Sequence, residues 1–265
     1  MGLQGVDKLV KKHRLALATK TVHNLLETHK ETRIGETLEN CVIPMLEWRL
    51  ASLDKEQGDT IGVETGCGKK VLVACSGGVD STASLIVACK AGLNPVAITL
   101  KLPWGGNSPV NLEKLCKEFG IPLETLGYTE KHLELFEDVQ QRGYHPCGRC
   151  HSLLVEELYS YAHNVGADLI GFGNMLPTGT HSIRVVGGNL VHVNIPALLA
   201  LDKCEALAIT GFTGRLDYGC NLLRVIHQKH RRTRWVSIQR VFRELRAGCI
   251  DAKMAEQFIW DILSA

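Results

Sequence analysis

Apolar and polar positions alternate along this chain with two different periods, and their order predicts an α/β fold. Between residues 70 and 172, apolar runs of four to six residues are separated by amphipathic segments of helical length. Short apolar runs that alternate with helices are typical of buried parallel strands. We therefore predict a doubly wound parallel sheet of Rossmann-like type, with helices on both faces. The expected strands are 71–75, 95–100, 123–126 and 168–172, and the expected helices are 81–91, 110–119, 129–141 and 152–165.

The first 57 residues have apolar positions three and four apart, which predicts a helical extension before the sheet. Four glycines between residues 57 and 70 then indicate a loop or a short hairpin as the link. The apolar positions that carry this helical pattern fall in two groups. These positions are Leu9, Val10, Leu15, Leu17, Val22, Leu25 and Leu26, then Leu38, Val42, Ile43, Leu46 and Leu50.

The C-terminal part contains a hairpin signal and two further helical patterns. Gly187 and Gly188 separate two apolar runs within 183–195 and predict a β-hairpin with a two-residue turn. Residues 237–245 and 252–263 have helical periodicity. We divide the chain into three parts: a helical N-terminal extension with its linker (1–69), a central α/β domain (70–222) and a basic C-terminal helical segment (223–265).

Length and composition limit the class of protein. A chain of 265 residues with 45% hydrophobic content can bury one substantial core and a small accessory domain. No apolar run approaches the ~20 residues that span a bilayer, and charges occupy the positions where a signal peptide has its apolar block. We therefore expect a cytoplasmic protein. In that reducing compartment ten cysteines indicate metal or sulfur chemistry, although we expect Cys75, Cys89 and Cys116 to be small core residues.

The net charge of +2 conceals an uneven distribution. Eight Lys and Arg residues and one acid, Glu244, lie between Arg224 and Arg246, which is a charge of +7 in 23 residues. Such a surface suits a long polyanion such as tRNA, and a solvated charged face is the alternative without a functional role. Within this segment Trp235 could stack on a base, but packing in the core is the interpretation that we favour.

The most informative motif is Val71–Ser81, VLVACSGGVDS, in which an apolar strand leads through small residues into a helix. Gly77 and Gly78 let the backbone approach an anion closely, and Ser76 and Ser81 offer hydroxyls beside the amides of the helix start. The pattern differs from the Walker loop, because no Gly-Lys-Ser/Thr closes it. It predicts a phosphate-binding loop, and a generic glycine turn is the alternative.

Residues 76–81, Ser-Gly-Gly-Val-Asp-Ser, resemble the SGGxDS signature of the PP-loop ATP pyrophosphatases, which split ATP into AMP and pyrophosphate while they adenylate a substrate oxygen. The resemblance implies a PP-loop/HUP-type fold with ATP and Mg²⁺ at the loop. Asp80 would orient the loop or contact the metal, or it could cap the following helix. Because parallel strands end at one edge of a sheet, Gly173 and Asn174 should meet the loop. The implied nucleotide-binding residues are Ser76, Gly77, Gly78, Asp80, Ser81, Thr82, Gly173 and Asn174.

A second motif, His-Pro-Cys-Gly-Arg-Cys-His over residues 145–151, places two cysteines just before a predicted helix. Two thiolates at this spacing can hold one metal ion or one cluster, because the turn directs both sulfurs to a common point. Two ligands do not complete a site, and Cys220, which lies among glycine and polar residues, is the best third partner. A structural zinc with His145 or His151 is an alternative, and Cys220 as an ordinary buried thiol is another.

The arrangement resembles the cluster-dependent tRNA thiolases of the PP-loop superfamily, the 2-thiouridine and 2-thiocytidine synthetases. The resemblance runs from about residue 70 to residue 220 and includes segments at 171–174 and 195–205, the second with Lys203 and Glu205. It implies a 4Fe-4S cluster bound by three thiolates. The implied ligands are Cys147, Cys150 and Cys220.

The sequence therefore predicts an AMP-forming sulfur transferase that adenylates a tRNA base carbonyl and replaces its oxygen with sulfur, with Asp80, Cys147 and Cys220 as catalytic residues. The implied partners are tRNA and a donor of sulfide or persulfide, and a homodimer is left open. The main alternative is a ligase or a sacrificial-type sulfur transferase acting on a small molecule, which Val79 also matches where the thiolases have lysine. A metal-stapled RNA-binding module with a degenerate nucleotide pocket is a third, non-enzymatic alternative.

Overall fold

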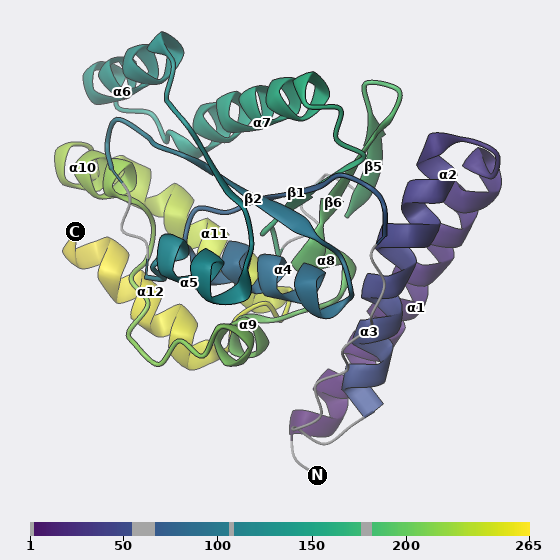
Figure 1. Cartoon of the computed structure of the whole chain (residues 1–265). Helices are drawn as coiled ribbons and strands as arrows, with labels where there is room; N and C mark the ends of the chain where they lie inside the picture. The colour runs from purple at the N-terminus through teal and green to yellow at the C-terminus, as the bar shows by residue number, and fades with distance from the viewer. Residues whose placement is uncertain (1–2, 55–66, 106–108, 176–181) are drawn as a thin grey trace.

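The computed structural model of this chain describes residues 3–54, 67–105, 109–175 and 182–265, and for residues 3–7 and 54 it describes the backbone alone. A sheet with strand order β3-β2-β1-β4-β6-β5 forms the centre (Figure 1). Of these strands five are parallel, and β5 at one edge is antiparallel, which confirms the predicted α/β class. The strands are β1 (Val71–Ala74), β2 (Pro95–Leu100), β3 (Leu123–Leu126), β4 (Leu169–Phe172), β5 (Ile183–Val186) and β6 (Leu190–Asn194).

The helices between the parallel strands are α4 (Val79–Lys90), α5 (Leu112–Phe119), α6 (Glu130–Arg142) and α7 (Cys147–Asn164). Successive side chains of a strand point to opposite faces of the sheet. Val71 and Val73 of β1 accordingly lie in an apolar cluster with α4 and α5, whereas Leu72 lies in a second cluster with α7. Figure 1 shows α6 and α7 on one side of the sheet and α4 and α5 on the other, as a doubly wound fold requires.

The predicted helices are confirmed, with one difference of consequence at α7. We expected a helix over 152–165, preceded by a turn that carries the cysteines, but α7 begins at Cys147. Pro146 precedes it in the N-cap position, where a missing N–H breaks no helical hydrogen bond. Cys147 and Cys150 therefore lie three residues apart on the first helical turn and share one face.

The hairpin predicted over 183–195 is present at the edge of the sheet. Strands β5 and β6 pair from Ile183 with Val193 to Val186 with Leu190, so the turn has three residues rather than the expected two. Gly187 and Gly188 have φ angles of 56° and 88°, which the turn requires and glycine adopts readily. Because β6 also pairs with β4, the hairpin extends the main sheet.

The N-terminal extension is helical, as predicted, and shares its core with the sheet. Leu15, Leu38 and Met45 are completely buried and belong to the same apolar cluster as β1 and α4. Figure 1 shows these helices packed beside the β5–β6 end of the fold. They are α1 (Leu3–His29), α2 (Arg33–Thr37), the π-helical segment η1 (Leu38–Val42) and α3 (Ile43–Asp54).

Four of the apolar residues that mark the helical pattern of this extension are exposed. In α1 the buried stripe is narrow and contains Leu15 and Val22. A stripe this narrow contacts the core along one line of the helix, which leaves the neighbouring apolar side chains in solvent. Most of the predicted linker, residues 57–66, lies outside the described residues. The exposed residues are Leu9, Val10, Leu17 and Leu50.

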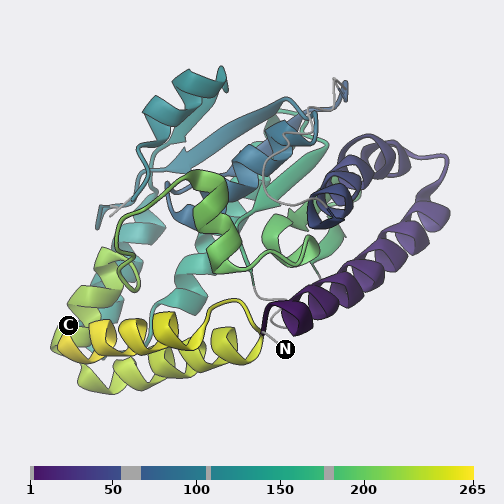
Figure 2. The same ribbon diagram turned by 90° about the horizontal axis from the view of Figure 1, so that it is seen from below.

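The C-terminal part adds helices that surround the carboxyl edge of the sheet. Two of them, at 234–246 and 252–264, confirm the predicted helices, and they pack on each other as a hairpin (Figure 2). The start of α1 approaches the turn of this hairpin, where Arg14 donates to the Ala247 carbonyl at 2.6 Å. The helices are α8 (Ile195–Leu198), α9 (Lys203–Thr210), α10 (Asn221–Lys229), the 3-10 helix η2 (Arg231–Thr233), α11 (Arg234–Arg246) and α12 (Ala252–Ser264).

Two expectations from composition can be compared with this fold. Cys75 and Cys116 are buried and Cys89 packs against the same apolar cluster, which confirms that these cysteines are core residues. Over the described ranges, no helix has the length and apolarity needed to cross a membrane. The cytoplasmic location and the three-part division of the chain stay predictions.

Candidate active site

The glycine-rich loop turns between the end of β1 and the start of α4. Gly77 has a φ of 75°, and Gly78 is the N-cap residue of the helix. The Ser81 hydroxyl donates to the Gly78 carbonyl at 3.0 Å and accepts from the Ser76 amide at 3.2 Å. Because the first turn of a helix leaves its amides without carbonyl partners, the loop presents N–H groups and the positive end of the helix dipole to an anion.

The loop lies where the order of the strands reverses. The chain proceeds from β1 to β2 and β3 on one side and then returns to β4 on the other side of β1. Ligands of such sheets bind beyond the carboxyl ends of the strands at this switch point. Gly173, directly after β4, lies against the first turn of α4, since a Cβ there would be 2.6 Å from the Ser81 amide nitrogen. The structure thus brings Gly173 to the loop, and only glycine allows so close an approach.

The other predicted nucleotide-binding residues lie at or behind this turn. Asn174 donates from Nδ2 to Oδ1 of Asn194 at 3.0 Å, which fixes its side chain at the ends of β4 and β6. Thr82 is completely buried, and its hydroxyl lies 3.9 Å from the sulfur of Cys75, so it supports the loop from the core side. Nucleotide binding by these residues stays a prediction.

Asp80 extends from the first turn of α4 to helix α9. Its carboxylate forms an ion pair with Nζ of Lys203, whose side chain is mostly buried. The alternative that Asp80 caps α4 is wrong, because Gly78 holds the N-cap position. The ion pair holds a carboxylate and an ammonium group beside the phosphate-binding loop.

Residues of the N-terminal helices secure the first turn of α9, which carries Lys203. Asp202 and Glu205 form a capping box at this turn. Nζ of Lys11 lies 2.5 Å from Oδ2 of Asp202, and Nη2 of Arg49 lies 2.8 Å from Oε1 of Glu205. The Asp-x-x-Glu spacing could have revealed the capping box. Sequence reasoning missed both cations, because their partners are 191 and 156 residues away along the chain.

The three predicted cysteine ligands come together where two helices begin. Cys147 and Cys150 lie on the first turn of α7, and Cys220 is the N-cap residue of α10. Burial is the main cause that raises the pKa of Cys147 to about 11 and that of Cys150 to about 12, and the neighbouring Cys220 thiol contributes to both. We call these three residues the thiol cluster.

The thiol cluster lies at the carboxyl edge of the sheet, where the phosphate-binding loop also lies. Helix α7 leads directly into β4, and so it begins at the opposite edge, at which the strands end. The start of α10 reaches the same edge, because Asn221 donates to the carbonyl of Trp104 at 3.2 Å, just beyond the end of β2. Cys150 and Cys220 both pack against the apolar cluster that includes Trp104.

The thiol cluster is not arranged as a ready-made site for a metal ion. In the described part of the chain, no three His, Cys, Asp or Glu side chains are arranged to hold one metal ion, with or without His145 and His151. The three thiols lie at the N-termini of two helices, where the helix dipoles favour anions such as thiolates. Binding of a metal ion or a cluster by these cysteines stays a prediction.

Arg240 of α11 adds a positive charge to the thiol cluster. This charge lowers the pKa of the Cys147 thiol, against the larger effect of burial. Nearby, the Ser237 hydroxyl lies 2.9 Å from Nε2 of His145 and 3.0 Å from Nε2 of His227, which ties α11 to the segment before α7. The sequence showed Arg240 only as part of a basic segment, because nothing local marks its contact with the thiols.

A buried polar network adjoins Asn174 at the ends of β4 and β6. Oδ1 of Asn194 accepts from Asn174 and lies 3.1 Å from Nε2 of His192. Tyr159 lies 2.7 Å from Nδ1 of the same histidine and accepts from Arg184 at 2.8 Å. Burial and the charge of Arg184 lower the pKa of His192 to about 4, so its ring is neutral near pH 7. Sequence reasoning missed this network, although a histidine within an apolar run was a visible signal.

The sequence of this chain is similar to that of an archaeal protein along most of its length. No family model matches the chain. An uncharacterized protein of Methanocaldococcus jannaschii, MJ1638, is 31% identical over 241 residues, which cover 88% of this chain and 86% of the relative.

Two tRNA-modifying enzymes are also similar to the chain. The tRNA-specific 2-thiouridylase MnmA of Caulobacter sp. strain K31 is 29% identical over 126 residues, 40% of this chain. The chain spans about a third of that enzyme's length, 31%. Among solved structures, the U34-tRNA thiolase NcsA from Methanococcus maripaludis with its 4Fe-4S cluster has a TM-score of 0.45 at 12% identity, covering 84% of this chain and 79% of the thiolase.

Proposed function

The chain belongs to the family of the Methanocaldococcus jannaschii protein MJ1638, within the PP-loop ATP pyrophosphatase superfamily, and we propose that it is an ATP-dependent sulfur transferase that modifies a tRNA base. The observation that carries this proposal is the gathering of three thiols at the sheet edge where the SGGVDS loop lies. The loop supports ATP as the activating reagent, and the thiols support sulfur as the group transferred. The similarity to a 2-thiouridylase over 40% of the chain supports a tRNA base as the acceptor.

In the first step the loop holds the phosphates of ATP at the start of α4, with Mg²⁺ offsetting their charge. The carbonyl oxygen of the base attacks the α-phosphorus, the bond to the bridging oxygen breaks, and pyrophosphate leaves. First-turn amides of α4 stabilise the charge that develops on the phosphates, and the Asp80–Lys203 pair keeps its charges oriented beside them. The base is then linked through its oxygen to AMP.

In the second step hydrosulfide attacks the activated carbon, the carbon–oxygen bond breaks, AMP leaves with the oxygen, and loss of the S–H proton gives the thiocarbonyl. The thiols of Cys147, Cys150 and Cys220 would hold a 4Fe-4S cluster, which supplies an iron without a protein ligand as a binding place for sulfide. Arg240 offsets negative charge beside Cys147. The sulfur itself comes from a donor of sulfide, or from a persulfide donor together with a thiol that attacks the inner sulfur, releases hydrosulfide and is oxidised to a disulfide.

The decisive test uses purified protein, ATP with Mg²⁺, sodium sulfide as the sulfur donor and an unmodified tRNA transcript. We expect release of pyrophosphate and AMP only with the transcript, and retention of the product RNA in a mercury-containing gel. Cys147→Ala should abolish thiolation while ATP binding persists, whereas the matched variant Cys89→Ala, a half-buried thiol of α4, should thiolate normally. Thiolation by Cys147→Ala at the normal rate would contradict the proposal.

The metal content tests the cofactor separately from the activity. After anaerobic purification we expect iron and acid-labile sulfide in equal amounts, and loss of both in Cys147→Ala, Cys150→Ala and Cys220→Ala. Zinc alone, or no metal with Cys220→Ala silent, would make the cysteines a structural staple or a persulfide pair.

One observation favours the alternative in which a small molecule, rather than a tRNA base, accepts the sulfur. Val79 is buried against Ala83 and Ala206, so this position offers no cationic side chain to the phosphates. The same residue type occurs in the sacrificial-type sulfur transferases and ligases that act on small molecules. RNA binding that weakens steeply with salt is required for the tRNA enzyme and not for this alternative, so a salt titration with the transcript separates the two.

A further inference from the structure

Three aromatic side chains are exposed on the C-terminal helix hairpin. Trp235, Phe242 and Trp260 are 64%, 54% and 63% accessible to solvent, which contradicts our expectation that Trp235 packs in the core. Trp235 and Phe242 are seven residues apart on α11 and therefore point from the same face of the helix. Exposed aromatic rings that lie close together on one helix hairpin are a feature that binding surfaces share.

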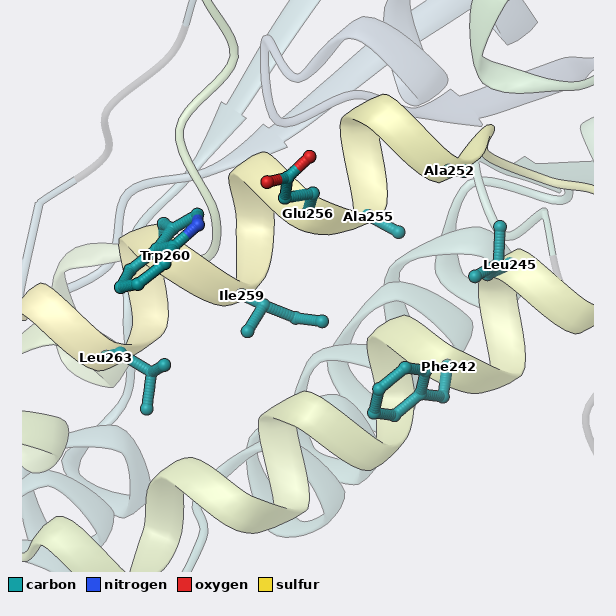
Figure 3. A pocket seen from close by; sticks show the side chains of 8 residues that line it. All are labelled: Phe242, Leu245, Ala252, Ala255, Glu256, Ile259, Trp260 and Leu263. Carbon is teal, nitrogen blue, oxygen red and sulfur yellow. The ribbon is translucent and has the colours of Figure 1, made fainter.

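A groove of about 330 Å³ runs between the two helices beside these aromatics (Figure 3). Apolar side chains of α11 and α12 form its walls, and Figure 3 shows Phe242 and Ile259 facing each other across it. Glu256 is the one charged residue among those that line it. The other lining residues are Leu245, Ala252, Ala255, Trp260 and Leu263.

Unpaired arginines surround the aromatic side chains. Within the described residues, the side chains of Arg231, Arg243 and Arg246 have neither an ion-pair partner nor a hydrogen-bond acceptor, and all three are exposed. They lie within four residues of Trp235 or Phe242 along the chain. Arginine side chains that can bind phosphate groups therefore lie close to aromatic rings on which bases can stack.

We propose that the α11–α12 face binds an unpaired loop of the RNA substrate, with bases stacked on Phe242, Trp260 and Trp235 and phosphates held by Arg243 and Arg246. Single-stranded RNA segments are recognised by this combination of aromatic platforms and positive charge. The inference rests on the proposed function for its choice of RNA as the ligand.

The same helix connects this face to the thiol cluster. Arg240, which affects the Cys147 thiol, is two residues from Phe242 on α11. Helix α11 would therefore contact the RNA through the face that carries Phe242, while Arg240 of the same helix lies beside the thiol cluster.

A second copy of this chain could also bind to the α11–α12 face. A two-fold contact through this face would bring the same patch of both copies together, and so would place their unpaired arginines against each other. Like charges at such an interface are unfavourable, whereas they attract a polyanion. Charge complementarity therefore favours RNA.

The test measures the affinity of a fluorescent tRNA transcript for the full chain by anisotropy over a range of salt concentrations. Phe242→Ala and Trp260→Ala should each weaken binding about tenfold, and Arg243→Ala with Arg246→Ala should reduce the salt slope by about two. Phe119→Ala and the pair Lys114→Ala with Lys117→Ala, on exposed positions of α5, are the matched controls and should bind as the wild type. A fully paired RNA of equal length should bind weakly and respond little to the aromatic substitutions.

Three outcomes are distinguishable. Unchanged affinity in the aromatic and arginine variants would overturn the docking proposal, even if the wild type thiolates tRNA. A wild-type dimer that these substitutions convert to monomers, with RNA binding intact, would overturn it in favour of an interface between copies. Loss of RNA binding in the variants, from a wild type that binds RNA but does not thiolate it, would support the docking surface while the proposed sulfur transfer fails.

Discussion

At the scale of single residues, two features stand out: the close approach of Gly173 to the first turn of α4, and the burial of two histidines. Gly173 lies so near the first turn of α4 that any side chain there would push the switch-point strands away from the phosphate-binding loop. Burial, together with the positive charges of Arg184 and Arg234, lowers the pKa values of His192 and His227, so both are held neutral. Each feature has a measurable consequence.

Gly173→Ala should weaken ATP binding at least tenfold and destabilise the fold by about 1–3 kcal/mol, because its Cβ would overlap backbone atoms of Ser81. Binding of a fluorescent ATP analogue and thermal unfolding would measure the two effects. Gly127→Ala, where a new Cβ would meet nothing within 4 Å, is the matched control and should leave both unchanged. Normal ATP affinity in Gly173→Ala would show that the loop does not need this approach.

Acid should destabilise the protein through its buried histidines. Burial lowers the pKa of His192 and of His227 to about 4, below the ~6.5 of an unfolded histidine. The unfolded chain therefore binds protons first as the pH falls, and the free energy of unfolding decreases between pH 6.5 and pH 4, by up to roughly 3 kcal/mol for each histidine. Urea unfolding at several pH values should show a shallower decrease in His227→Gln than in the wild type, whereas His13→Gln, on the exposed face of α1, should match the wild type.

At the scale of elements, helix α9 connects the N-terminal extension to the phosphate-binding loop. Lys203, in the first turn of α9, forms an ion pair with Asp80. Asp202, the N-cap residue, forms an ion pair with Lys11, and Glu205 forms one with Arg49. Since α9 also packs along α4, the extension positions the charged pair at the loop.

Arg49→Ala should test this connection. The guanidinium is buried and donates to the Leu199 carbonyl at 2.9 Å as well as to Glu205, so its removal leaves buried acceptors unpaired. We expect a loss of about 3–5 kcal/mol in the free energy of unfolding, together with slower pyrophosphate release. Arg142→Ala breaks an exposed pair with Asp138 instead and should cost less than about 1 kcal/mol. Equal effects of the two substitutions would rule out the connection.

At the scale of the whole molecule, the N-terminal helices and the sheet share one core. Completely buried residues of the extension, such as Leu38 and Met45, lie in the same cluster as Val73 and Leu85. The extension therefore contributes to the fold as well as to the position of α9. The hairpin of α11 and α12, in contrast, has an apolar cluster of its own.

A chain that lacks residues 1–54 should not fold cooperatively, because the deletion exposes the apolar face that α1 and α3 cover. Circular dichroism and tryptophan fluorescence should give one coincident unfolding transition for the full chain and none for the truncated chain. A stable, ATP-binding fragment 55–265 would show instead that the extension is dispensable for folding.

The sequence predicted those parts of the fold and site that depend on neighbouring residues. The strand and helix order between residues 70 and 172, the loop at 76–81 and the two cysteines of 145–151 are all encoded in periods and spacings shorter than a dozen residues. The missed start of α7 was a local error, because Pro146 can precede a helix as readily as it can end a turn.

By itself, then, the sequence determined the fold class, the glycine-rich loop at 76–81 and the spacing of Cys147 and Cys150, because backbone propensity and side-chain period act locally. Only the tertiary structure decided which distant residues meet: Lys203 with Asp80, Arg49 with Glu205, and Arg240 with Cys147. It also decided that Trp235 is exposed, since α11 has apolar residues on more than one face and α12 covers the face with Ile238 and Val241. Contacts between residues a hundred positions apart depend on how whole helices pack, and no local pattern contains that information.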